Sequence, residues 1–202
     1  MENYIEVRWH GRAQQGMVTA AKLLGEAALM EGKYVQAFPE FGPERMGAPV
    51  RAFNRVSSEP IKMHCQVTNP NIVLIADQTL IGMALSGGME SFGSVTSGTE
   101  KDGIFIVNTP NSPEIMRKML SLAEGFGKVY TLDASKISRE TIKREMPNTP
   151  MLGAVAKVTG LIKLDSLIED FKENYAKKYS AQVIEGNVAA MKAGFEGVKG
   201  EK

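Results

Sequence analysis

The sequence is poor in the residues that build redox centres and metal sites. It contains one cysteine, Cys65, and two histidines, His10 and His64. A single cysteine cannot form an internal disulfide, and a protein-bound iron–sulfur cluster generally needs about four cysteine ligands. His64 and Cys65 are adjacent, so in an extended segment they point to opposite faces and make a poor zinc site. We therefore expect redox chemistry to lie in another polypeptide, and Cys65 to be a small buried apolar residue.

Long hydrophobic runs and an excess of one charge are also missing. No apolar run approaches the roughly 18 to 20 residues that span a bilayer, and the first residues lack the basic and apolar regions of an export signal. Lys and Arg number 24 against 23 Asp and Glu, for a net charge of +1, which disfavours binding to nucleic acid over a broad surface. We expect a cytoplasmic chain with no membrane or nucleic-acid partner, folded as a single domain over residues 1–202.

Segments typical of strands and helices alternate along the chain. The patterns predict strands over residues 4–10, 33–38, 50–56, 61–67, 72–76, 104–107 and 128–132. They predict helices over residues 17–30, 112–124 and 137–144, and further helices from residue 151 onward. Residues 198–202 are polar, and we expect them to be a frayed tail.

This order of elements indicates an α/β fold. Strands that alternate with helices predict a Rossmann-like three-layer domain, with a mostly parallel sheet covered on both faces. Residues 50–56 and 61–67 are expected to form an inserted hairpin, which would make the sheet mixed. The C-terminal part is expected to be helical.

A glycine-rich turn, residues 11–16, separates the first predicted strand from the first helix. Such a turn presents main-chain N–H groups and a helix N-terminus to an anion. Gly11 and Gly16 fit the outer positions of a Gly-x-Gly-x-x-Gly fingerprint, but Ala13 replaces the central glycine. The acidic residue expected about 20 positions later is also missing, because Gln36 stands there. A self-sufficient NAD dehydrogenase is therefore disfavoured.

The same spacing of Gly11 and Gly16 matches a P-loop. The next two residues are Met17 and Val18, however, and not the lysine and hydroxyl residue that hold phosphates and Mg²⁺. NTP hydrolysis is therefore excluded. Two interpretations of the turn stay open: contact with a phosphate-bearing ligand, or tight turn geometry alone.

The candidate ligand-binding residues lie in this turn and in the loop after the second strand. Arg12 could reach a phosphate or pair across a subunit interface, and the side chains of Gln14 and Gln15 could bind a ligand or brace the turn. Arg45 could contact a ligand or partner, or form a surface pair with Glu44. The full set is Gly11, Arg12, Ala13, Gln14, Gln15, Gly16 and Arg45.

Three blocks of the sequence resemble the γ subunit of 2-oxoacid:ferredoxin oxidoreductases of the pyruvate and 2-oxoisovalerate type. Residues 10–22 resemble the family's opening His-Gly-Arg-Gly-Gly-Gln-Gly segment and its small-residue helix, with Ala13 and Gln14 in place of two glycines. Residues 34–50 resemble its second strand and following loop. Residues 148–154, Asn-Thr-Pro-Met-Leu-Gly-Ala, resemble a third block.

The resemblance implies a place in a multisubunit enzyme of anaerobic metabolism, such as a pyruvate synthase. That enzyme would decarboxylate a 2-oxoacid oxidatively to an acyl-CoA and CO₂ and reduce ferredoxin. It implies that thiamine diphosphate, Mg²⁺ and [4Fe-4S] clusters belong to partner subunits, α, β and a ferredoxin-like δ. This chain would be inactive alone and would help to bind coenzyme A, whose phosphates suit amide-rich turns.

The resemblance does not name the oxoacid. Pyruvate, a branched-chain oxoacid, 2-oxoglutarate and an aryl glyoxylate all fit, because the pocket around thiamine diphosphate selects the substrate. The alternative to the γ subunit is a freestanding nucleotide- or acyl-CoA-binding module without catalysis.

Overall fold

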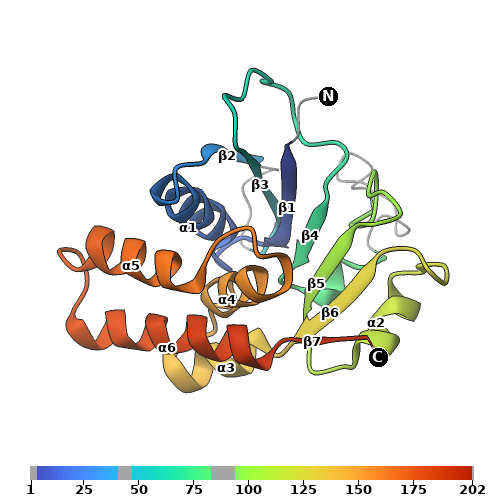
Figure 1. The fold of residues 1–202 in the computed structure, drawn as a ribbon. Coiled ribbons are helices and arrows are strands. Elements are labelled where there is room, and N and C mark those ends of the chain that lie inside the picture. The colour runs from blue at the N-terminus through green and yellow to red at the C-terminus, as the bar shows by residue number, and fades with distance from the viewer. Residues whose placement is uncertain (1–3, 41–46, 83–93, 202) are drawn as a thin grey trace.

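The strand segments of the sequence pair into one mixed sheet (Figure 1). The computed structural model describes residues 4–40, 47–82 and 94–201, which form a seven-stranded sheet in the order β2-β3-β1-β4-β5-β6-β7. The strands β1, β4, β5 and β6 are parallel, and the other strand pairs are antiparallel. The predicted mixed α/β sheet is confirmed. The strands are β1 (Ile5–Arg12), β2 (Tyr34–Glu40), β3 (Pro49–Ser57), β4 (Ile72–Ile75), β5 (Ile104–Asn108), β6 (Lys128–Leu132) and β7 (Lys199–Gly200).

Both faces of the central strands are covered. Successive side chains of a strand point to opposite faces, so Leu74 of β4 packs in the cluster that includes helices α1 and α4, while Val73 and Ile75 pack against α2. The layers therefore follow the predicted three-layer arrangement. The helices are α1 (Met17–Met30), η1 (Gln78–Leu80, a 3₁₀ turn), α2 (Pro113–Met119), α3 (Ala134–Thr141), α4 (Asn148–Thr159), α5 (Leu164–Tyr175) and α6 (Ala181–Gly197).

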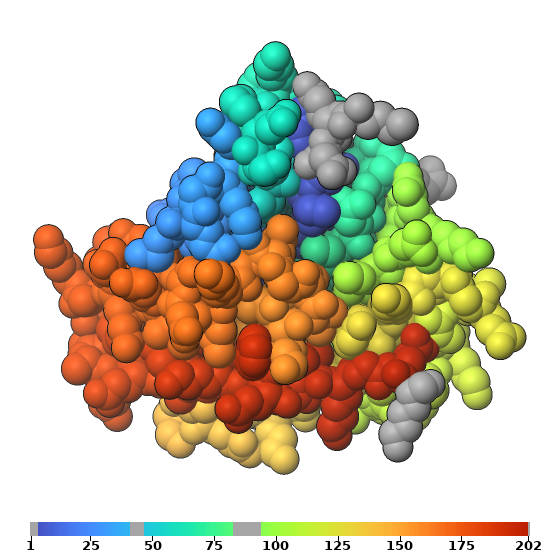
Figure 2. Space-filling view, viewed as in Figure 1, coloured from blue at the N-terminus to red at the C-terminus, as the bar shows by residue number. Residues whose placement is uncertain are grey.

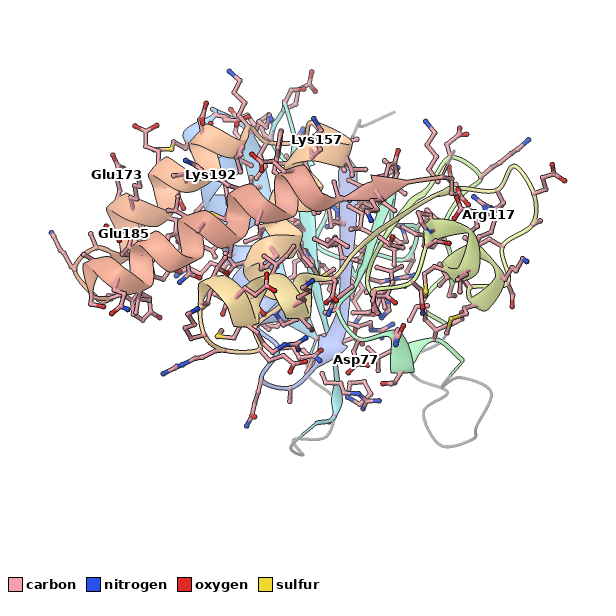
Figure 3. The ribbon with its side chains drawn as sticks, turned by 90° about the horizontal axis from the view of Figure 1, so that it is seen from below. Asp77, Arg117, Lys157, Glu173, Glu185 and Lys192 are labelled. Carbon is pink, nitrogen blue, oxygen red and sulfur yellow. The ribbon has the colours of Figure 1, made fainter. Side chains whose placement is uncertain are left out.

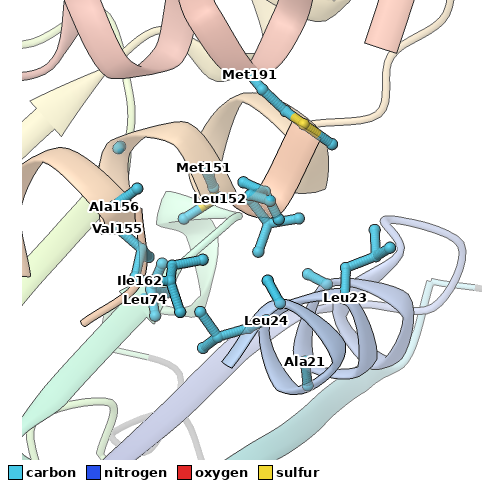
Figure 4. Close-up of a cluster of buried hydrophobic side chains, with 14 of the residues drawn as sticks. Ala21, Leu23, Leu24, Leu74, Met151, Leu152, Val155, Ala156, Ile162 and Met191 are labelled. Carbon is cyan, nitrogen blue, oxygen red and sulfur yellow. The ribbon is translucent and has the colours of Figure 1, made fainter. Parts of the chain in front are cut away.

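The larger core lies between the sheet and the helices of the C-terminal part. Side chains from α1, β4, α4 and α6 meet there (Figure 4). A β-carbon on Gly153 of α4 would lie 1.9 Å from the carbonyl oxygen of Met191 in α6, so the two helix backbones are in direct contact. Helices α4, α5 and α6 form a continuous band across this side of the molecule (Figure 2). This packing fixes the N-terminus of α4.

The predicted hairpin of residues 50–56 and 61–67 is wrong. β3 is flanked by β1 on one side and β2 on the other, so no edge of β3 is left for another strand. The antiparallel hairpin is formed by β2 and β3. Residues 61–67 are not a strand; side chains hold them instead, since Gln36 donates to the carbonyl of Met63 and Arg55 to that of Cys65.

The predicted frayed tail is also wrong for residues 198–201. The outer edge of β6 is open to pairing, and β7 occupies it through Thr131 and Lys199. The carboxylate of Glu201 then pairs with Arg117 of α2 and accepts a hydrogen bond from the backbone N–H of Val129. Backbone pairing and a partly exposed ion pair thus hold a segment whose polar composition suggested fraying.

Three helices differ from the predicted bounds: α2, α3, and α4, which begins at Asn148 and not at residue 151. α3 begins at Ala134, and not at residue 137, because the Asp133 side chain accepts from the backbone N–H of Lys136 at 2.8 Å and caps the first turn. α2 ends at Met119, and not at residue 124, because Ser121 takes a left-handed conformation at φ 55° that a helix cannot continue.

Candidate functional site

The turn between β1 and α1 lies at the carboxyl edge of the sheet. The neighbouring strands β1 and β4 are parallel, and the segments that follow them pack on opposite faces of the sheet. β1 continues into α1, whose buried residues belong to the larger core on one face. The neighbouring strand β4 continues into η1, whose Leu80 packs on the other face. A crevice opens where the connections of adjacent parallel strands diverge in this way, and α/β proteins usually bind ligands there.

The turn is shaped by short internal hydrogen bonds and two left-handed residues. Gln14 and Gly16 have φ values of 77° and 78°. The backbone N–H of Arg12 donates to Oε1 of Gln15 at 2.8 Å, and the N–H of Gln15 donates to the carbonyl of Arg12 at 3.1 Å. The side chain of Gln15 therefore folds back and braces the turn.

Helix α1 begins directly after the turn with an uncapped N-terminus. Gly16 is the N-cap residue and has no side chain to offer, and the first turn of the helix contains no acidic residue. The first N–H groups of a helix have no partner within the helix, and the helix dipole adds partial positive charge at that end. This arrangement suits a phosphate or another anion.

Arg12 does not point into open space. Its Nε lies 3.1 Å from Oδ2 of Asp77, its Nη2 donates to Oγ1 of Thr79 at 2.8 Å, and its Nη1 donates to the carbonyl of Gly47 at 2.9 Å. The guanidinium thus joins three segments: the end of β1, the turn after β4, and the chain returning toward β3. Backbone pairing adds to this, because the N–H of Ala13 donates to the carbonyl of Ala48.

Asp77 is the acceptor on which this arrangement centres. It receives Gln15 Nε2 at 3.2 Å in addition to Arg12, and its other oxygen receives the N–H and the hydroxyl of Thr79. Burial alone would raise the pKa of the Asp77 carboxyl. The hydrogen bonds from Thr79 and Gln15 and the charge of Arg12 outweigh burial and hold this pKa below its usual value, so the side chain is a carboxylate at neutral pH.

The N-terminus of α4 reaches the same turn. A β-carbon on Gly16 would lie 2.6 Å from Nδ2 of Asn148, the first residue of α4. Asn148 is only 2% exposed, and its Oδ1 has no hydrogen-bond partner among the described residues. A buried acceptor of this kind is costly unless something donates to it. The N-termini of α1 and α4 therefore meet at Gly16, with Nδ2 of Asn148 as the nearest side-chain atom.

Similarity to known proteins identifies the family of this chain. The model of the family described as pyruvate ferredoxin/flavodoxin oxidoreductase matches residues 6–197. The chain belongs to this family. It is 44% identical over 199 residues to the pyruvate synthase subunit PorC of Thermotoga maritima, covering 98% of this chain and 96% of the relative. It is 43% identical over 192 residues to the pyruvate/ketoisovalerate oxidoreductases common subunit gamma of Pyrococcus abyssi, covering 95% and 96%.

Solved structures agree with this membership. The crystal structure of pyruvate oxidoreductase subunit PORC from Thermotoga maritima superposes with a TM-score of 0.84 at 41% identity and full coverage of both chains. A 2-oxoglutarate:ferredoxin oxidoreductase from Magnetococcus marinus, solved with 2-oxoglutarate, coenzyme A and succinyl-CoA bound, superposes with a TM-score of 0.71 at 20% identity. That match covers 96% of this chain and 31% of the other, and it shows the fold alone. The chain is a γ-type member of the family.

The structure brings most of the predicted site residues of this γ-type chain together. Gly11 to Gly16 form the end of β1 and the turn, although β1 extends to Arg12 and the turn is shorter than predicted. Arg45 lies outside the described residues. Asp77 and Asn148 were missed as site residues. Asp77 follows a buried strand at its carboxyl end, which is a signal that the sequence does offer, whereas nothing local indicates that Asn148 approaches Gly16.

His10 and Cys65 are two further residues that the sequence offered for chemistry, and neither joins the turn. His10 is buried, and its Nε2 accepts from Nε of Arg8 at 2.9 Å. Burial, with the charges of Arg8 and Arg51, lowers the pKa of His10 well below its usual value, so its imidazole stays neutral and is occupied as an acceptor. Cys65 is exposed, which corrects the expectation of a buried residue; it lies in the segment that does not join the sheet.

Within residues 4–40, 47–82 and 94–201, no three His, Cys, Asp or Glu side chains come together as a metal site. No helix in this part of the chain has the length and apolar character needed to cross a membrane.

Proposed function

We propose that this chain is the γ subunit of a cytoplasmic, multisubunit 2-oxoacid:ferredoxin oxidoreductase, and that its β1–α1 turn helps to bind coenzyme A. The complex would decarboxylate a 2-oxoacid oxidatively, transfer the acyl group to coenzyme A and pass the electrons to ferredoxin. The observation that carries the proposal is the uncapped N-terminus of α1, which follows β1 at the carboxyl edge of the sheet beside β4.

Different groups of the turn would brace it and bind the phosphates. Arg12 and Gln15 are held by Asp77, and the N–H of Gln15 is bonded within the turn, so the phosphate contacts fall to the main-chain amides of Gln14 and of Gly16 to Val18 and to the side chain of Gln14. The coenzyme A bound in the Magnetococcus relative supports this class of ligand.

The remaining cofactors belong, in this proposal, to the partner subunits. Thiamine diphosphate with Mg²⁺ and [4Fe-4S] clusters would lie in α, β and a ferredoxin-like δ subunit, with ferredoxin as the electron acceptor. The chain would be inactive alone. The partner pocket around thiamine diphosphate would then select the oxoacid.

Steady-state kinetics of the intact complex test the coenzyme A assignment. Gly16→Val fills the space beside Asn148, so we expect a higher KM for coenzyme A with a smaller change in the KM for the 2-oxoacid. Gly32→Val is the matched control, because Gly32 has the same φ of 78° but nothing within 4 Å of its would-be β-carbon. Arg45→Ala is expected to act like Gly16→Val. An effect of Gly16→Val confined to the 2-oxoacid would place the coenzyme A site elsewhere.

Purification from the native source under anoxic conditions tests the assembly. We expect the chain to co-purify with larger subunits that carry an iron–sulfur chromophore. A colourless, monodisperse monomer that binds coenzyme A would favour the alternative, a freestanding acyl-CoA-binding module.

A further inference from the structure

Asp77 connects two segments that are far apart in the sequence. It follows β4 at the carboxyl edge of the sheet (Figure 3). Its Oδ2 accepts from Nε of Arg12 at 3.1 Å and from Nε2 of Gln15 at 3.2 Å. Arg12 is the last residue of β1 and Gln15 directly precedes Gly16, so the two residues flank the turn. One carboxylate oxygen therefore holds both ends of the proposed ligand turn.

The second oxygen of Asp77 is fixed by its own loop. Oδ1 accepts from the backbone N–H of Thr79 at 2.9 Å and from its hydroxyl at 2.6 Å. The Thr79 hydroxyl oxygen also receives Nη2 of Arg12 at 2.8 Å. Both oxygens are thus engaged, and the carboxylate has little freedom to move away from the turn.

The turn itself needs such support. Left-handed backbone at Gln14 and Gly16 is unfavourable unless the surroundings impose it. The internal bond from the N–H of Arg12 to Oε1 of Gln15 depends on the orientation of the Gln15 side chain, and Asp77 sets that orientation. Loss of the carboxylate would release Gln15 and Arg12 together.

We propose that Asp77 is a positioning residue that holds the β1–α1 turn in the conformation that binds the phosphates of coenzyme A. This inference rests on the function proposed above. Asp77 does not touch the ligand; it acts through Arg12 and Gln15. Its negative charge works against a nearby anion, so an electrostatic effect and a positioning effect have opposite signs. If positioning dominates, removal of the charge weakens binding of coenzyme A.

The test is Asp77→Asn in the intact complex. We expect the KM for coenzyme A to rise about tenfold, the size expected when a charge-assisted hydrogen bond that orders a site is lost. The KM for the 2-oxoacid and kcat should change much less. Asp77→Glu, which keeps the charge, should recover part of the loss.

Asp133→Asn is the matched control. Asp133 also follows a parallel strand, β6, and also caps a helical turn, by accepting from the N–H of Lys136. Its side chain bonds to the first turn of α3, and β4 and β5 separate β6 from β1 and its turn. The melting temperature of each complex measures any general loss of stability. A structural role alone would lower it in both variants and leave the KM for coenzyme A unchanged.

The outcomes separate this inference from the proposed function when Gly16→Val is measured alongside. If Gly16→Val raises the KM for coenzyme A while Asp77→Asn leaves it unchanged, lowers it, or raises both substrate KM values equally, the inference fails and the proposed function stands. If Gly16→Val has no effect, the turn is not the coenzyme A site. The inference then fails as well, whatever Asp77→Asn does, because Asp77 is proposed to act through the turn.

Discussion

Gly16 and Asn148 lie so close that a β-carbon on the glycine would be 2.6 Å from Nδ2 of the asparagine. The pair joins the start of α1 to the start of α4, which are far apart in the sequence. Because Gly16 also has a φ of 78°, two independent constraints favour glycine there, one steric and one from the backbone.

The first prediction separates these two constraints by stability. Gly16→Ala and Gly32→Ala should both lose about 1–2 kcal/mol from placing a β-carbon in left-handed backbone. Only Gly16→Ala also meets Asn148, so we expect its free energy of unfolding to fall further, by roughly 1 kcal/mol or more. Urea denaturation of the full chain measures both variants. The double change Gly16→Ala with Asn148→Ala should recover the extra loss, and equal losses for the two single variants would argue against the close contact.

Asn54 gives a second prediction, on the core. It is fully buried, its Oδ1 accepts from Nε1 of Trp9 at 2.8 Å, and its Nδ2 donates to the carbonyl of Ala21 at 2.7 Å. Asn54→Ala leaves the indole N–H unsatisfied and creates a cavity, at a cost of about 2–4 kcal/mol. The exposed Asn69, changed to Ala, should cost roughly 0.5 kcal/mol or less in the same denaturation experiment. Similar losses for both would mean that the Trp9–Asn54 bond contributes little.

The contact between α1 and α5 predicts an unusual dependence of stability on pH. Asp170 is 6% exposed, and burial, together with the charge of Glu26, raises its pKa to about 6. Oδ2 of Asp170 and Oε2 of Glu26 are buried, with no hydrogen-bond partner among the described residues. Lys22, which lies beside Glu26, offsets part of this repulsion.

The sign follows from the raised pKa. Between about pH 4 and pH 6 the folded chain keeps a proton on Asp170 that the unfolded chain releases, so rising pH weakens the fold through this group. Asp170→Asn removes that penalty. Its free energy of unfolding, relative to the unchanged chain, should therefore be higher near pH 7 than near pH 4. Glu169→Gln, at the exposed neighbouring position on α5, should show a smaller difference. A constant difference across this range would contradict the assignment.

Arg117 and Glu201 supply a fourth prediction. Nη2 of Arg117 donates to Oε2 of Glu201 at 2.7 Å. The hydrogen bonding from Arg117 is the main reason that the pKa of Glu201 lies below its usual value. Glu201→Gln should destabilise the full chain by about 1–2 kcal/mol. Because the folded-state pKa is lowered, the loss should be complete above the unfolded pKa and shrink as the pH falls below it. Glu196→Gln, at an exposed position on α6, is the control; an equal effect there would mean that the ion pair does not hold the tail.

The sequence predicted those parts of the molecule that local patterns determine. The helix over residues 17–30 and the strand over residues 128–132 have the predicted bounds, because helix formers between two glycines and a β-branched run decide them locally. The turn at residues 11–16 was found for the same reason. Where a segment's partner is distant, prediction failed: residues 61–67 have no free strand edge to join, and Glu201 is held by Arg117.

The same distinction applies to the site. The glycines mark the turn, but the residues that hold it come from the ends of other elements. Asp77 reaches the turn because β4 pairs with β1 in parallel, and Asn148 reaches it because α4 packs on α1. No local sequence pattern indicates either contact. Arg12 was therefore interpreted as a phosphate contact or an interface residue, and Gln15 as a ligand contact or a brace. Their bonds to Asp77 favour a bracing role for both.

The structure of the intact complex with coenzyme A bound tests the central claim most directly. The account predicts that a phosphate of coenzyme A lies within hydrogen-bond distance of the main-chain N–H groups of Gln14 or of Gly16 to Val18, with the Arg12–Asp77 pair intact behind the turn. A complex in which every phosphate contact came from other subunits, far from the start of α1, would contradict it.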